Sequence, residues 1–155
     1  MTDPKTLTAV AEFHKTFKHP ILQTPTIPDE KRCQLRVSLI GEELKELEEA
    51  ISDKNITEVA DALCDIQYVL SGAVLEFGLA DKFSQLFDEV QRSNMSKACN
   101  TVQEAEDTVA HYQQKGVECF YEEADGHYLV YRAADRKTLK SVHYSPADLK
   151  GILED

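Results

Sequence analysis

The segment from Glu58 to Phe77 restricts the fold of this 155-residue chain most, because it is apolar on almost every side. Its apolar residues follow helical spacing, and a helix of this kind is expected to be buried on most of its faces. Apart from Glu76 near its end, its charges are Glu58, Asp61 and Asp65, which fall within about 60° of one another on a helix. We therefore expect an all-α core in which this helix carries a single stripe of carboxylates.

Such a stripe needs cations, because two carboxylates about 5 Å apart repel by roughly 3 kcal/mol even at an effective dielectric constant of 20. The preceding helical segment carries more acids on one side, in line with Leu35 and Leu39. A short turn between the two helices would set both acidic stripes face to face. An all-oxygen ligand set favours Mg²⁺, with Mn²⁺ as the alternative, over zinc. The candidate metal ligands are Glu42, Glu43, Glu46, Glu58, Asp61 and Asp65.

Two other interpretations of this acidic region are open. A solvated helix face is the general alternative, and it is the better account of Glu48 and Glu49. Di-iron helical bundles also use inward carboxylates, but they pair Glu with His at i and i+3, and these helices contain no such pair.

The chain has 28 acidic and 17 basic residues and a formal charge of −11. Much of the excess lies between Glu42 and Asp65, where nine acids accompany two lysines. This charge disfavours binding to nucleic acid or to anionic membranes, whereas a bound divalent metal would attract a single triphosphate. No stretch is apolar for long enough to span a membrane. Four cysteines without a CxxC pair and a polar start favour a reduced, cytoplasmic protein.

The chain is predicted to fold as a four-helix-bundle-like core with a small C-terminal β-hairpin appendage. We expect residues 1–100 to form the core and residues 101–155 to form an extension of helix, hairpin and short helix packed on the same domain. The predicted helices cover Lys5–Lys18, Asp29 to about Ser52, Glu58–Phe77, Asp81 onward, and Val102–Lys115. The predicted strands are Val117–Tyr121 and His127–Arg132, and a helix capped by Ser145 runs toward Leu153.

Basic and amide groups gather after the fourth predicted helix. Asn94 and Lys97 lie one helical turn apart on the same side, close to Arg92. A lysine suits a phosphate oxygen, and an asparagine can orient a ribose or a phosphate. The alternative for Lys97 is that it complements the negative end of the helix dipole.

Several motifs occur in a fixed order along the chain. They are Phe13-His-Lys-Thr-Phe17, Glu42-Glu43-x-x-Glu46, Glu58-x-x-Asp61, Glu89-Val-Gln-Arg-Ser-Asn-Met-Ser-Lys97, Asp135-x-Lys137-x-Leu-Lys140 and Tyr144-Ser-Pro-Ala-Asp-Leu149. In this order and spacing they resemble the all-α nucleotide pyrophosphohydrolases of the MazG-like and phosphoribosyl-ATP pyrophosphohydrolase superfamily.

The resemblance implies a hydrolase that cleaves a nucleoside triphosphate to a nucleoside monophosphate and pyrophosphate with Mg²⁺. Glu43 and Glu46 take the catalytic positions, Glu43 as a metal ligand or as the base that orients the water. Asp65 precedes a tyrosine as the motif aspartate does in some relatives, so Asp61 and Asp65 both stay candidate ligands. The resemblance also implies a homodimer or a tetramer of paired dimers.

The substrate-binding candidates implied by the resemblance are Asn94, Lys97, Arg92, His14 and Phe17. His14 and Phe17 would stack on the base, although aromatic residues at helical spacing are more often part of a core. The expected substrate is a free, noncanonical or deoxy nucleotide. The alternatives are phosphoribosyl-ATP hydrolysis in histidine biosynthesis and a non-catalytic helical module that binds nucleotide or metal.

Overall fold

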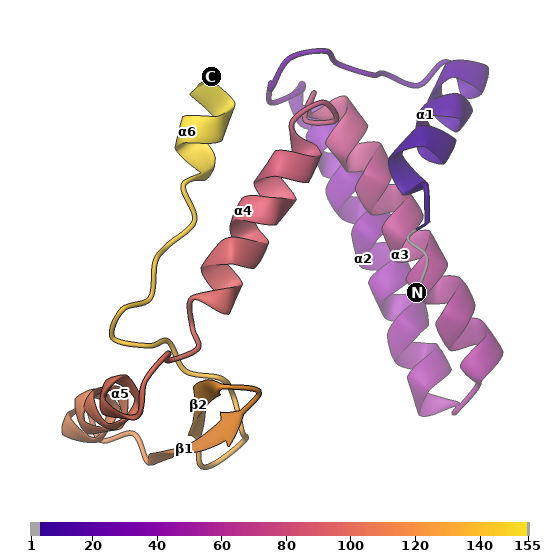
Figure 1. Cartoon of the computed structure of the whole chain (residues 1–155). Helices are drawn as coiled ribbons and strands as arrows, with labels where there is room; N and C mark the ends of the chain where they lie inside the picture. Colours follow the sequence, from indigo (N-terminus) through magenta and orange to yellow (C-terminus); the bar gives the residue numbers. More distant parts are fainter. Residues whose placement is uncertain (1–3, 155) are drawn as a thin grey trace. The chain divides into compact units, whose positions relative to one another are not determined.

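The computed structural model describes residues 4–154, which are mostly helical with one small antiparallel hairpin (Figure 1). The elements are α1 Thr6–Phe17, α2 Glu30–Ser52, α3 Ile56–Glu76, α4 Phe83–Met95, α5 Val102–Gln114, β1 Cys119–Ala124, β2 His127–Arg132 and α6 Leu149–Glu154. The predicted fold class, all-α with a hairpin appendage, is confirmed. The chain divides into two compact units, one ending at Ser84 and the other beginning at Gln85. No described helix is both long and apolar enough to cross a membrane.

Side-chain caps fix where the long helices begin. The Asp29 carboxylate accepts a hydrogen bond from the Arg32 backbone N–H at 3.1 Å, as the sequence predicts. Asn55 caps α3 in the same way through the N–H groups of Thr57 and Glu58, so this helix begins two residues before Glu58. α4 begins at Phe83 rather than at Asp81.

In the first unit, α2 and α3 lie side by side as an antiparallel pair joined by residues 53–55, which confirms the predicted short turn (Figure 1). α1 packs on α3. The proline-containing connector follows the far end of α3, where Leu22 N–H donates to Leu75 O at 3.0 Å and Thr26 N–H donates to Phe77 O at 3.0 Å. The acidic segments of α2 and α3 therefore share one helical hairpin.

The expectation that α3 is buried on most of its faces is wrong for the single chain. Leu63 is 52% exposed, Leu70 is 41% exposed and Cys64 is exposed. The acidic stripes are also more open than predicted, because only Glu43 and Asp65 are half-buried. Within the described part of this unit, α1 is the helix that packs on the α2–α3 pair, and one helix cannot cover both sides of a pair.

In the second unit, α5 packs against the hairpin around a small core of Cys99, Ala105 and Val130. The strands pair from Cys119 with Arg132 to Ala124 with His127. The turn residues Asp125 and Gly126 both have positive φ, which is the conformation that favours Asp-Gly in a two-residue hairpin turn. The predicted hairpin is confirmed, with its first strand two residues later than expected.

The predicted cap of the last helix is wrong. α6 begins at Leu149, and Asp148 caps it by accepting from Gly151 N–H at 3.0 Å. Ser145 instead exchanges hydrogen bonds with Ser96 on both its N–H and its C=O. A serine followed by proline resembles a helix start, but long-range partners hold this one in an irregular segment before α6.

Candidate active site

Four carboxylates gather around Glu43 on the α2–α3 pair. Burial and then the neighbouring charges of Glu46, Asp65, Glu42 and Asp61 raise the pKa of Glu43 above its ordinary value. The structure thus brings together four of the other predicted ligands around this half-buried glutamate. Their mutual repulsion is the electrostatic condition under which a divalent cation binds favourably.

Glu58, the sixth predicted ligand, lies nearer the turn between the two helices. It lines a surface depression with Glu46, Glu49 and Asp53. Its charge is not among those that shift the pKa of Glu43. Glu46 belongs to both groups, so it links the depression to the carboxylates around Glu43.

The residues present fit a hard cation by their chemistry. All six candidates offer only oxygen, and Mg²⁺ typically takes one or two carboxylates and completes its shell with water and phosphate. Within residues 4–154, no three His, Cys, Asp or Glu side chains are already arranged to hold a metal ion. Four of the six candidates are exposed, and one of these, Glu42, accepts a hydrogen bond from Ser38 Oγ at 2.8 Å.

An apolar cavity of about 230 Å³ lies further along the same two helices. On α3, Tyr68 and Gly72 continue the line of Asp61 and Asp65, so the cavity begins about 5 Å along the helix from the acidic stripe. Aromatic rings enclose it: Phe13 stacks on His19 at 5.8 Å and meets Tyr68 edge-on at 5.6 Å. Its lining residues are Val10, Phe13, His14, His19, Arg32, Leu35, Arg36, Leu39, Tyr68, Val69 and Gly72.

His14 is buried and has both ring nitrogens engaged. Nδ1 lies 2.9 Å from Pro20 O, and Nε2 lies 3.2 Å from an Arg36 nitrogen. Burial is the main reason that the pKa of His14 is lowered, and the Arg36 charge adds to the effect. A neutral ring that donates from Nδ1 and accepts at Nε2 satisfies both contacts. His14 therefore forms part of the cavity wall, while Phe17, at the other end of its motif, is 61% exposed and packs on Phe13 at 4.4 Å.

Sequence reasoning missed an ion cluster at one side of this cavity. Glu76, completely buried at the end of α3, accepts hydrogen bonds from Arg32 and Arg36 of α2. Arg36 is itself 7% exposed, and its Nε has no hydrogen-bond partner among the described residues. A Cβ at Gly72 would lie 2.5 Å from the Arg36 guanidinium, so the glycine allows the guanidinium to lie this close to α3. The sequence signal was present: two arginines at i and i+4 on α2, and a glutamate at the apolar end of α3.

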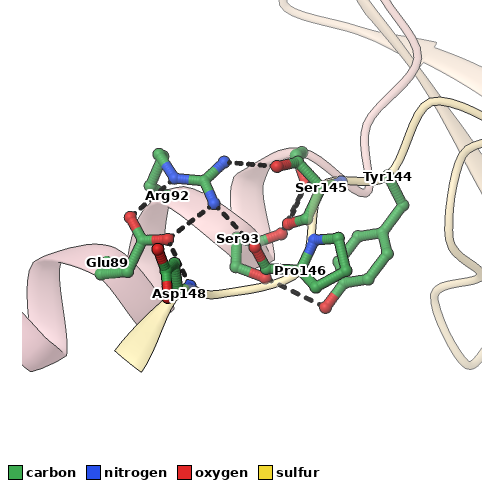
Figure 2. Close-up of polar contacts among 8 residues, drawn as sticks. Glu89, Arg92, Ser93, Tyr144, Ser145, Pro146 and Asp148 are labelled. Atoms are coloured by element: carbon green, nitrogen blue, oxygen red, sulfur yellow. Dashed lines mark hydrogen bonds and ion pairs between the residues drawn. The ribbon is translucent and has the colours of Figure 1, made fainter. Parts of the chain in front are cut away.

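The remaining candidates lie in the second unit. Lys97 Nζ donates to Asn94 Oδ1 at 2.7 Å, so the predicted one-turn pair is in contact. The Arg92 guanidinium donates to both carboxylate oxygens of Glu89 and also to Ser145 Oγ and Pro146 O (Figure 2). Four of its five N–H groups therefore have partners within the protein. Substrate contacts by these residues stay predictions.

The chain is similar to one protein family and to one viral protein. Residues 10–94 match the family model described as phosphoribosyl-ATP pyrophosphohydrolase, which is more than half of the chain. An uncharacterized protein of Acanthamoeba polyphaga mimivirus is 26% identical, and the similarity covers 94% of each chain. The family match contains all six carboxylates and the aromatic cavity, and the viral relative extends the similarity through the C-terminal region.

Proposed function

Because the chain belongs to the phosphoribosyl-ATP pyrophosphohydrolase family, we propose that it hydrolyses a free nucleoside triphosphate between the α and β phosphates, with Mg²⁺. The products are a nucleoside monophosphate and pyrophosphate. The single observation that carries this proposal is the set of four carboxylates whose charges converge on Glu43.

The residues that would hold the metal are Glu42, Glu46, Asp61 and Asp65, with Glu58 at the edge of the group. When bound, Mg²⁺ neutralises phosphate charge and lowers the pKa of a coordinated water. Glu43 is the residue we assign to orient the attacking water and accept its proton, because burial and the charges of the neighbouring carboxylates raise its pKa. Glu46 lies on the next turn of α2, and its charge helps to raise the pKa of Glu43.

The aromatic cavity is the place we assign to the nucleobase. It lies on the same two helices as the carboxylates, and Phe13 and Tyr68 offer ring faces and edges for stacking. The partnerless Nε of Arg36 is a buried donor that a base carbonyl could satisfy. We also propose His14 and Phe17 as contacts of the nucleobase. Of these two residues, His14 lies in the cavity wall.

A panel of nucleotides tests the proposal. Canonical, deoxy and noncanonical triphosphates and phosphoribosyl-ATP are incubated with the protein and Mg²⁺, and pyrophosphate release is measured. We expect release from at least one free triphosphate. Turnover confined to phosphoribosyl-ATP would instead support the function that the family description names. Binding without turnover of any nucleotide would support a non-catalytic module.

A homodimer is the assembly we propose, because the α2–α3 pair exposes two apolar stripes with seven-residue spacing. Val37, Leu44 and Ile51 on α2 are 73%, 50% and 58% exposed. Ile56, Leu63 and Leu70 on α3 are 78%, 52% and 41% exposed. Exposed apolar residues at seven-residue spacing are typical of helices that pack on another helical pair.

Sedimentation velocity tests this assembly. We expect the wild type to sediment as a dimer or larger and the double variant Leu44→Lys, Leu63→Lys to sediment as a monomer, because two charges would enter the apolar interface. Glu49→Lys changes an exposed residue of α2 outside the stripe and should leave the assembly intact. A monomeric wild type at micromolar concentration would contradict the dimer.

A further inference from the structure

The lining of the aromatic cavity changes from exposed at one end to buried at the other. Phe13 and Tyr68 are exposed, so their rings mark the mouth of the cavity. His14, Arg36 and Gly72 are buried and form its inner end. An apolar cavity of about 150 Å³ is large enough for benzene, so a cavity of about 230 Å³ is large enough for a nucleobase. A base stacked at the mouth would therefore point one edge toward Arg36.

Arg36 also lies at the end of the cavity that is farther from the carboxylates. It precedes Glu43 by seven residues on α2, which is about 10 Å along the helix, and Leu39 of the lining lies between them. A triphosphate held by the carboxylates would keep the sugar on the Leu39 side. The edge of the base that meets Arg36 is then the edge away from the sugar.

The acceptors around the Arg36 guanidinium are already in use. Glu76 accepts hydrogen bonds from Arg36 and from Arg32. His14 Nε2 lies 3.2 Å from an Arg36 nitrogen, and His14 Nδ1 lies 2.9 Å from Pro20 O. Arg36 Nε, in contrast, has no hydrogen-bond partner within residues 4–154. A buried donor without a partner is costly, so a ligand acceptor at this nitrogen would be favourable.

The inner end of the cavity also carries an excess of positive charge. Arg32 and Arg36 share the single carboxylate of Glu76, which leaves one of their two charges uncompensated within the cluster. A guanidinium donates hydrogen bonds but never accepts them. Among the described residues that line the cavity, no side chain is Asp, Glu, Asn, Gln, Ser or Thr. A carbonyl oxygen therefore suits this end of the cavity, whereas an amino group would bring another donor to it.

We infer that the cavity selects nucleobases with a carbonyl oxygen on the edge away from the sugar, and that Arg36 Nε donates to this oxygen. Uracil, thymine, guanine and hypoxanthine present such an oxygen, at O4 or O6, whereas cytosine and adenine present an amino group there. The inference rests on the proposed function, because it names the class of base in the same substrate. Phosphoribosyl-ATP, whose base derives from adenine, is expected to bind poorly.

Calorimetric titration of the full chain with nucleoside monophosphates and Mg²⁺ tests the inference without requiring turnover. UMP and CMP form one matched pair, and IMP and AMP form another, because the members of each pair differ mainly in the carbonyl or amino group. We expect UMP and IMP to bind at least about tenfold more tightly than CMP and AMP, since an amino group leaves Arg36 Nε without an acceptor. 4-Thio-UMP should bind less tightly than UMP, because sulfur is a weak acceptor.

Arg36→Lys tests the residue itself. Lysine keeps a positive charge beside Glu76 but has no Nε donor, so the preference for UMP over CMP should fall below about threefold. Arg32→Lys is the matched control, because Arg32 pairs with the same Glu76 and its Nε already donates to that carboxylate at 3.0 Å. This variant should keep the preference. Thermal unfolding establishes whether both variants are folded, and the paired ligands decide on the wild type alone if Arg36→Lys is not.

The outcomes separate this inference from the proposed function. If no triphosphate is hydrolysed but UMP and IMP still bind more tightly than CMP and AMP, the proposed function fails and the selection of the base stands. If triphosphates are hydrolysed but the members of each pair bind equally, the inference is wrong. A folded Arg36→Lys variant that keeps the whole preference would also overturn it, as would a wild type that binds none of the four monophosphates.

Discussion

Glu43→Gln is expected to reduce kcat for nucleotide hydrolysis by at least about 100-fold, the usual contribution of a positioned general base. The reason is that Glu43 is the carboxylate on which the charges of Glu46, Asp65, Glu42 and Asp61 converge. Glutamine keeps the size of the side chain but cannot take a proton from water. Pyrophosphate release at saturating nucleotide and Mg²⁺ is the measurement.

The same substitution should stabilise the metal-free protein. The pKa of Glu43 is raised in the folded chain, so its ionised form opposes folding, and that cost appears as the pH rises through the folded-state pKa. Removing the charge should therefore raise Tm at neutral pH, by up to about 3 °C for this partly exposed group. Glu48→Gln makes the same charge change on an exposed residue of α2 and should keep its activity. An active Glu43→Gln variant would contradict the role assigned to Glu43.

Glu76→Gln is expected to lower the free energy of unfolding by about 3–5 kcal/mol, the usual cost of breaking a buried ion pair. Glu76 has no exposed surface, and its partner Arg36 is also buried. Without the carboxylate, Arg36 keeps a buried positive charge beside His14 and has no anion to compensate it. Urea-induced unfolding measures the difference, and Glu12→Gln on the exposed side of α1 is the control.

The effect of Glu76→Gln should depend on pH. Burial alone would raise the pKa of Glu76, but the hydrogen bonds and charges of Arg36 and Arg32 outweigh it and lower the pKa below the ordinary 4.5. The stabilisation is therefore complete above about pH 4.5 and is lost as the pH falls through the lower folded-state value. The wild type and the variant should converge in stability on acidification. A constant difference down to strongly acidic pH would show that the carboxylate charge is not the cause.

Local chemistry allowed much of the fold to be predicted from the sequence. The cap at Asp29, the Asp125-Gly126 turn and the periodicity of the long helices act within a few residues, so the printed sequence contains the whole signal. Ser145 shows the limit of such rules. Its partners Arg92 and Ser96 are about fifty positions away in sequence, and a local capping pattern cannot include them.

The candidate site could be predicted in part for the same reason. Helical spacing was enough to group Glu43 with Asp61 and Asp65, because the short turn after α2 fixes which faces meet. Helical spacing was not enough to show that Glu58 lies apart from the carboxylates around Glu43, closer to that turn. Periodicity also did not reveal that Glu76 is buried and pairs with Arg32 and Arg36. Its burial depends on how the connector and α1 pack at the end of α3.

The apolar stripes on α2 and α3 also affect how the stability of this protein is measured. If a second copy covers Leu44 and Leu63, folding is coupled to association, and dilution then lowers Tm by mass action. Two preparations of identical sequence at different concentrations would unfold at different temperatures. A series of melting curves over a hundredfold range of protein concentration would therefore report the strength of the interface directly.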